Sequence, residues 1–162
     1  MRYILLVVIL LFSACSYKSN YLSASNKQTT EQGVANTKKI QLPVNGKPKI
    51  FITITYLNSL KNKDFVDKNL EQFVVGIHNI GLSEKELKLS LKDIKFSIND
   101  SVDFLSVREL KADDKILDIV PASNPWSTYY LVQTQKISKN IIKFIVEIYP
   151  FSEASLTFEK DY

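Results

Sequence analysis

Apolar and polar residues alternate along much of residues 40–162, and this period of two is typical of strands that bury one face. In Lys49–Asn58, every second side chain from Ile50 to Tyr56 is apolar, and Ile, Thr and Tyr suit a pleated sheet. Seven further segments show similar patterning: Gln72–Ile80, Glu86–Ile98, Val102–Val107, Ile116–Val120, Thr128–Gln135, Asn140–Tyr149 and Ser155–Lys160. Some seven to eight strands at this spacing predict an all-β fold, an antiparallel sandwich.

Two segments depart from simple alternation. In Glu86–Ile98 the apolar phase slips by one residue near Lys92-Asp93, which predicts a bulge or a crossing between sheets. In Asp64–Gln72 the apolar residues have roughly helical spacing, so we expect one short helix there.

The first residues have the features of a secretory leader. Ten apolar residues, Tyr3–Phe12, follow the single charge of Arg2. A membrane-spanning helix needs about 20 apolar residues, whereas ten match the core of a signal peptide. We therefore expect residues 1–14 to form a cleaved signal peptide.

Phe12-Ser13-Ala14-Cys15 resembles the lipobox of bacterial lipoproteins, although Phe12 stands where Leu is usual. The resemblance implies that the Cys15 thiol carries a diacylglycerol, that cleavage occurs just before it, and that the lipid holds the protein on a membrane. Two alternatives stay open: an ordinary signal peptide with a spare cysteine, and a buried apolar helix. Because Ser16 rather than Asp follows the cysteine, the resemblance favours the outer membrane of a Gram-negative cell.

Residues 15–39 are predicted to be the lipidated N-terminus and a flexible tether. Seventeen of the 24 residues in 16–39 are Ser, Asn, Thr, Gln, Lys or Glu, without helical or strand periodicity. Such a segment buries too little apolar surface to offset the entropy of ordering it. The alternative is that part of it pairs as an edge strand.

The net charge of +4 does not belong to the predicted domain. Residues 40–162 hold 16 basic and 16 acidic side chains, since the surplus lies at Arg2 and in the tether. Nucleic-acid binding requires a concentrated basic face, so we expect no nucleic-acid partner.

The composition excludes several kinds of chemistry. One cysteine excludes an internal disulfide framework and multi-cysteine metal sites, and one histidine excludes paired-histidine zinc sites. His78 lies in a predicted strand, and Asp113-Asp114 lies in a polar, turn-like segment. No G-x-S-x-G elbow is present. We therefore expect no enzyme, no catalytic residue, no cofactor and no metal ion.

A second, weaker resemblance concerns the domain. Phe73–Asn79, the turn Asn79–Gly81 and Leu91–Phe96 resemble segments of the immunoglobulin-like sandwiches that many bacterial envelope lipoproteins carry. The antibody-type Cys…Trp…Cys core is absent, so no antibody-like domain is implied. Function does not follow from this fold.

The segment Asn124–Tyr130 is the candidate binding patch. It holds the only tryptophan, Trp126, together with Tyr129 and Tyr130, and rigid aromatic rings at a loop–strand junction are typical of interfaces. The alternative is that Trp126 caps the open end of the core. If both tyrosines lie in a strand, they face opposite ways.

Together these features predict a lipid-anchored cell-envelope protein that acts as a non-enzymatic structural or protein-interaction module with an envelope protein as its partner. The alternative is a ligand-binding lipoprotein that captures a glycan or small solute through the Trp126 loop.

Overall fold

The structure is a computed structural model that describes residues 31–44, 47–60, 66–79, 94–99, 106–121, 123–149 and 152–160. The predicted signal peptide, Cys15 and residues 16–30 of the predicted tether lie outside these residues. Among the described residues, no helix is long and apolar enough to cross a membrane.

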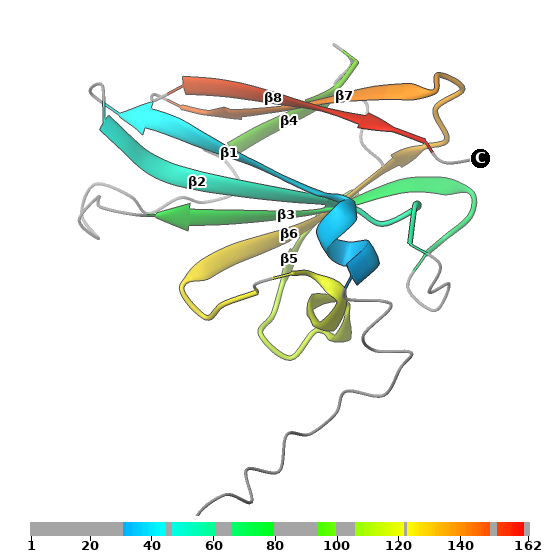
Figure 1. Cartoon of the computed structure of the whole chain (residues 1–162), viewed down its shortest axis with the longest axis horizontal. Coiled ribbons are helices and arrows are strands. Elements are labelled where there is room, and N and C mark those ends of the chain that lie inside the picture. The colour runs from blue at the N-terminus through cyan, green and yellow to red at the C-terminus, as the bar shows by residue number, and fades with distance from the viewer. Residues whose placement is uncertain are drawn as a thin grey trace, which may run out of the picture.

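The predicted all-β sandwich is confirmed. The strands are β1 (Thr37–Val44), β2 (Lys47–Tyr56), β3 (Leu70–Asn79), β4 (Ile94–Ile98), β5 (Ser106–Leu110), β6 (Ser127–Gln135), β7 (Ile141–Ile148) and β8 (Ser152–Glu159). They form a five-stranded sheet in the order β1-β2-β3-β6-β5 and a three-stranded sheet in the order β4-β7-β8, with every pairing antiparallel. The likeness to an immunoglobulin-like domain is loose. Figure 1 shows the smaller sheet lying over one face of the larger one.

The inner core lies between the two sheets and is built around aromatic rings. The Phe73 ring centroid lies 5.0 Å from that of Tyr56 and 4.8 Å from that of Phe144. Phe73 and Tyr56 belong to the larger sheet and Phe144 to the smaller one, so these contacts join the sheets. Burying such rings is among the largest single contributions to a core.

An outer core covers the opposite face of the larger sheet. It consists of Leu57, Leu60, Val74, Leu110, Ile116, Leu117, Ile119, Val120, Tyr129 and Leu131. Because both faces are covered, every residue of β3 from Glu71 to Ile77 is buried.

The predicted strand at Ile116–Val120 is wrong, because a 3₁₀ helix, η3 (Lys115–Ile119), occupies this segment. Its buried side chains are Ile116, Leu117 and Ile119, and they pack in the outer core. A short apolar run does not distinguish a strand from a buried helical turn. The segment forms a helical turn because its apolar side chains cover the outer face of the larger sheet.

The helix expected at Asp64–Gln72 is not found in the described part of that segment. Leu70–Gln72, the last part of the expected helix Asp64–Gln72, opens β3 instead, and residues 66–69 contain only a turn. Pairing of Leu70 with Gln135 of β6 overrides the local helical spacing. In the third predicted segment only Ile94–Ile98 is described, and the expected phase slip at Lys92-Asp93 lies outside the described residues.

The folded part begins before residue 40, within the segment assigned to the tether. Residues 31–35 form a helical turn, and β1 starts at Thr37 as an edge strand paired with β2. Gly33 is buried against the end of η3 and the following Pro121: a Cβ built on it would lie 2.6 Å from the Ile119 carbonyl oxygen and 3.3 Å from the Pro121 ring. The helical turn is therefore part of the outer layer.

We predict that Gly33→Ala destabilises the protein. The added methyl group meets a backbone oxygen, and overpacking of this kind costs about 1–3 kcal/mol. Urea unfolding should show a lower midpoint for this variant than for the wild type. Val34→Ala is the control, because Val34 is 59% exposed and should tolerate truncation. Equal midpoints for Gly33→Ala and the wild type would show that the turn does not pack.

Candidate functional site

The structure places the three aromatic residues of the predicted patch in three different environments. Trp126 is 81% exposed, so it does not cap the core. Tyr130 is buried in the inner core and Tyr129 in the outer core, on opposite faces of β6. Burial, with a smaller contribution from the charge of Glu109, raises the pKa of Tyr130 to about 12. Of the three rings, only that of Trp126 is exposed to solvent.

Tyr129 connects the outer core to the loop that carries Trp126. It pairs with Gly76 of β3, and a Cβ on Gly76 would lie 2.7 Å from the Tyr129 ring. Glycine at this position therefore lets the ring lie against the neighbouring strand. The ring orientation directs the Tyr129 hydroxyl to the loop, where it accepts a hydrogen bond of 2.9 Å from the backbone N–H of Asn124.

Asn124 organises the loop around Trp126. Its side-chain oxygen accepts hydrogen bonds from the backbone N–H of Trp126 at 3.0 Å and from the Ser127 hydroxyl at 3.1 Å. The Ser127 oxygen also lies 2.7 Å from Nδ1 of His78 on β3. The loop is thus joined to β6 through Asn124 and to β3 through Ser127, whereas the indole ring of Trp126 lies in solvent.

A pocket of about 300 Å³ lies beside the Trp126 loop. Leu110, Leu117 and Tyr129 supply apolar surface, while Asp118 supplies an exposed carboxylate. Loop residues line the same pocket: Ser123, Asn124, Pro125 and Ser127. An apolar floor with a few polar groups is typical of small-ligand sites.

The Trp126 loop and the start of β1 lie at different ends of the larger sheet. In register, Thr37 is level with Thr55, Val74 and Leu131. Ser127, which follows Trp126, begins β6 four residues earlier than Leu131, about 13 Å along the strand. Figure 1 shows β6 starting at the end of the sheet away from the helical turn that precedes β1.

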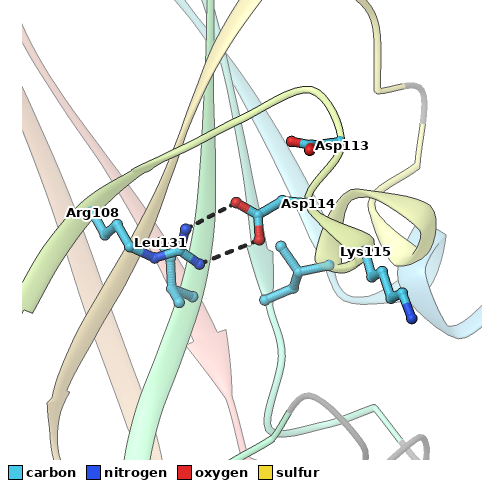
Figure 2. A pocket seen from close by; sticks show the side chains of 6 residues that line it. Arg108, Asp113, Asp114, Lys115 and Leu131 are labelled. Carbon is cyan, nitrogen blue, oxygen red and sulfur yellow. Dashed lines mark hydrogen bonds and ion pairs between the residues drawn. The ribbon is translucent and has the colours of Figure 1, made fainter.

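A larger open hollow, of about 520 Å³, lies against β5 and the start of η3. Figure 2 shows an ion pair between two of the residues that line it: Arg108 Nη1 lies 2.9 Å from Oδ2 of Asp114. The two charges satisfy each other, and the carboxylate also accepts a hydrogen bond from the backbone N–H of Lys111. These contacts tie β5 to the residue that precedes η3, so we assign the pair a structural role.

No cluster among the described residues combines three or more His, Cys, Asp or Glu side chains in an arrangement that could hold a metal ion. His78 contacts Ser127 through Nδ1, and Asp113 lies apart from the Arg108–Asp114 pair in Figure 2.

Sequence reasoning located Trp126 but missed Asn124, Ser127 and His78 as the residues that fix its loop. The Asn124-Pro125 dipeptide is a turn signal that could have identified the first of these. Ser127 and His78 are 49 residues apart in the chain, so no local sequence pattern predicts their contact.

Comparison of the chain with protein families, with curated proteins and with solved structures finds no match.

The Arg108–Asp114 pair generates a prediction about pH. The hydrogen bond from Arg108 holds the pKa of the Asp114 carboxyl below its ordinary value of 3.8. A carboxyl with a lowered folded-state pKa stabilises the fold in full above 3.8, and this contribution is lost as the pH falls through the folded-state pKa. Asp114→Asn should therefore lower the urea midpoint at neutral pH, and its difference from the wild type should narrow below pH 3.8.

Asp113→Asn is the matched control, because it removes a neighbouring carboxylate outside the ion pair. A difference between Asp114→Asn and the wild type that stays constant into the acid range would contradict the assigned role of the pair.

Proposed function

We propose that this protein is a lipid-anchored component of the cell envelope whose sandwich binds another envelope protein without catalysing a reaction. The observation that carries the proposal is the 81% exposed Trp126 on a loop fixed by hydrogen bonds to its own backbone. The lipid on Cys15 and the outer-membrane location of a Gram-negative cell are parts of the same proposal and depend on the lipobox resemblance.

An exposed tryptophan on an ordered loop suits protein recognition. Tryptophan is enriched among the residues that dominate interface energies, because a large rigid ring buries much surface at a low cost in side-chain entropy. Asn124 and Tyr129 fix the loop before any partner arrives, which reduces the entropy lost on binding. The ring has no packing role in the domain, since it lies in solvent.

The position of the Trp126 loop at one end of the larger sheet supports a role at a membrane. The chain enters the larger sheet at β1, and Trp126 lies at the other end of that sheet. An anchor upstream of β1 would let the domain present Trp126 away from the bilayer. Confinement to a surface also raises the effective concentration of the protein for partners on that surface.

We predict that Trp126→Ala removes the partner from crosslinked complexes in intact membranes. Removing a side chain that becomes buried in an interface costs about 2 kcal/mol or more of binding free energy, which weakens binding roughly 30-fold. Truncating a side chain that is exposed in the free protein changes the free energy of unfolding by less than about 0.5 kcal/mol. Mass spectrometry of the crosslinked species and urea unfolding measure the two effects. Tyr149→Ala is the matched control, since Tyr149 is another exposed ring, 72% accessible, outside the loop. Unchanged crosslinks in Trp126→Ala would refute the interaction site.

The pocket beside the loop supports a second candidate function, the capture of a glycan or small solute. A substitution of Asp118 distinguishes the two candidate functions, because Asp118 lines the pocket and Trp126 does not. For a glycan, Asp118→Asn should weaken binding of N-acetylglucosamine oligomers, measured by the emission of the only tryptophan in the chain. For a protein partner, Asp118→Asn should leave the crosslinks in place.

We predict that Cys15→Ala releases the protein from membranes. Each acyl CH₂ buried in a bilayer contributes about 0.8 kcal/mol, so the chains of a lipidated cysteine hold the protein firmly. After a salt wash, the variant should appear in the supernatant and the wild type in the pellet, with the mass of the wild type raised by the lipid. Ser19→Ala is the control in the tether. Retention of Cys15→Ala in the membrane would overturn the anchor but not the Trp126 site.

A further inference from the structure

A cluster of charged side chains lies at the end of the sandwich remote from Trp126. Glu71, near the start of β3, is fully buried and lies at the end of the inner core. Its Oε2 accepts a hydrogen bond of 2.6 Å from the Tyr56 hydroxyl. Lys160, which follows β8, places Nζ 2.5 Å from Oε1. Because β3 and β8 belong to different sheets, this ion pair closes the end of the sandwich.

The Glu71 carboxylate is satisfied without its second lysine. The backbone N–H of Ile137 donates to Oε1 at 3.3 Å, in addition to the bonds from Tyr56 and Lys160. Lys136 Nζ lies 3.7 Å from the same oxygen, too far for a hydrogen bond, and its side chain is 50% exposed. Lys160 neutralises Glu71, so among the described side chains of this cluster Lys136 is a surplus positive charge.

The surplus charge lies at a pocket of about 260 Å³ lined by Tyr56, Asn58, Ser59, Lys136, Ile137, Ser138 and Lys160. The Ser59 hydroxyl is a second polar group at this pocket whose hydrogen bonding is unsatisfied among the described residues. Its oxygen is buried and has no hydrogen-bond partner among them. A buried hydroxyl without a partner is costly, and such a group in a native protein calls for an explanation. No hydrogen bond to a described residue restrains this hydroxyl, so a turn about χ1 would break none of them.

We propose that this pocket binds one phosphate group of low charge, with Lys136 and Ser59 as its principal donors. Lysine binds phosphate as a point charge, whereas a carboxylate ligand would favour the planar fork of an arginine, and no arginine lines the pocket. One surplus positive charge matches a monoanionic phosphate. The phosphate of a lipid headgroup and free inorganic phosphate share this chemistry.

The test is a titration of the purified full chain in neutral detergent, followed by NMR signals of the backbone amides of Ile137 and Ser138. One arm uses inorganic phosphate, and the other uses short-chain phosphatidylglycerol with short-chain phosphatidylcholine as the comparison. Saturable shifts with inorganic phosphate alone assign a free phosphate. Saturation by phosphatidylglycerol at a lower concentration than by inorganic phosphate assigns an anionic headgroup.

The variants identify the donors. Lys136→Gln should weaken binding about tenfold, the usual effect of losing a hydrogen bond to a charged group. Lys139→Gln is the matched control, since Lys139 is exposed on the same connection and does not line the pocket. Ser59→Ala should weaken binding without lowering the urea midpoint of the ligand-free protein, because the hydroxyl has no hydrogen bond to a described residue to lose.

The proposal is overturned if neither arm gives a saturable shift, or if Lys136→Gln binds as tightly as the wild type. These outcomes do not bear on the proposed interaction function, which Trp126→Ala and Cys15→Ala test at other positions.

Discussion

The central strands β3 and β6 carry apolar side chains on both faces, and water must be excluded from both. The three-stranded sheet covers one face, while η3 and residues 57–60 cover the other. This double coverage explains why a segment with a strand-like apolar run, Ile116–Val120, folds as a 3₁₀ helix. It also explains why residues 31–35 belong to the domain, since Gly33 packs against the end of η3 and Pro121.

The same coverage determines how Trp126 is presented. The Tyr129 ring packs in the outer core against Gly76, and a side chain at position 76 would collide with it. Its hydroxyl then reaches Asn124, which in turn binds the backbone of Trp126. Core packing thus fixes a loop whose most prominent side chain takes no part in the core. This arrangement separates the stability of the domain from the recognition that we propose for it.

The ends of the sandwich differ in chemistry. At one end an aromatic ring is exposed beside a pocket with a single carboxylate, Asp118. At the other end Glu71 is buried beneath two lysines, and its partner Lys160 lies 89 residues further along the chain. Breaking a buried ion pair leaves an uncompensated charge, so Glu71 and Lys160 must be retained together. The two ends therefore differ in charge and in the side chains that they expose.

The amino-acid pattern by itself determined the all-β class, most of the strands and the place of the only tryptophan at a loop–strand junction, because alternation and turn residues act over a few neighbouring positions. That Trp126 is exposed rather than a cap on the core was decided by the tertiary structure. The bounds of β2, β6, β7 and β8 fall within three residues of the predicted ones. Only the tertiary structure decided that Tyr129 and Tyr130 are both buried, that η3 is helical and that Glu71 meets Lys136 and Lys160. Each of these depends on which surfaces meet across long separations in the chain, and no local periodicity encodes that choice.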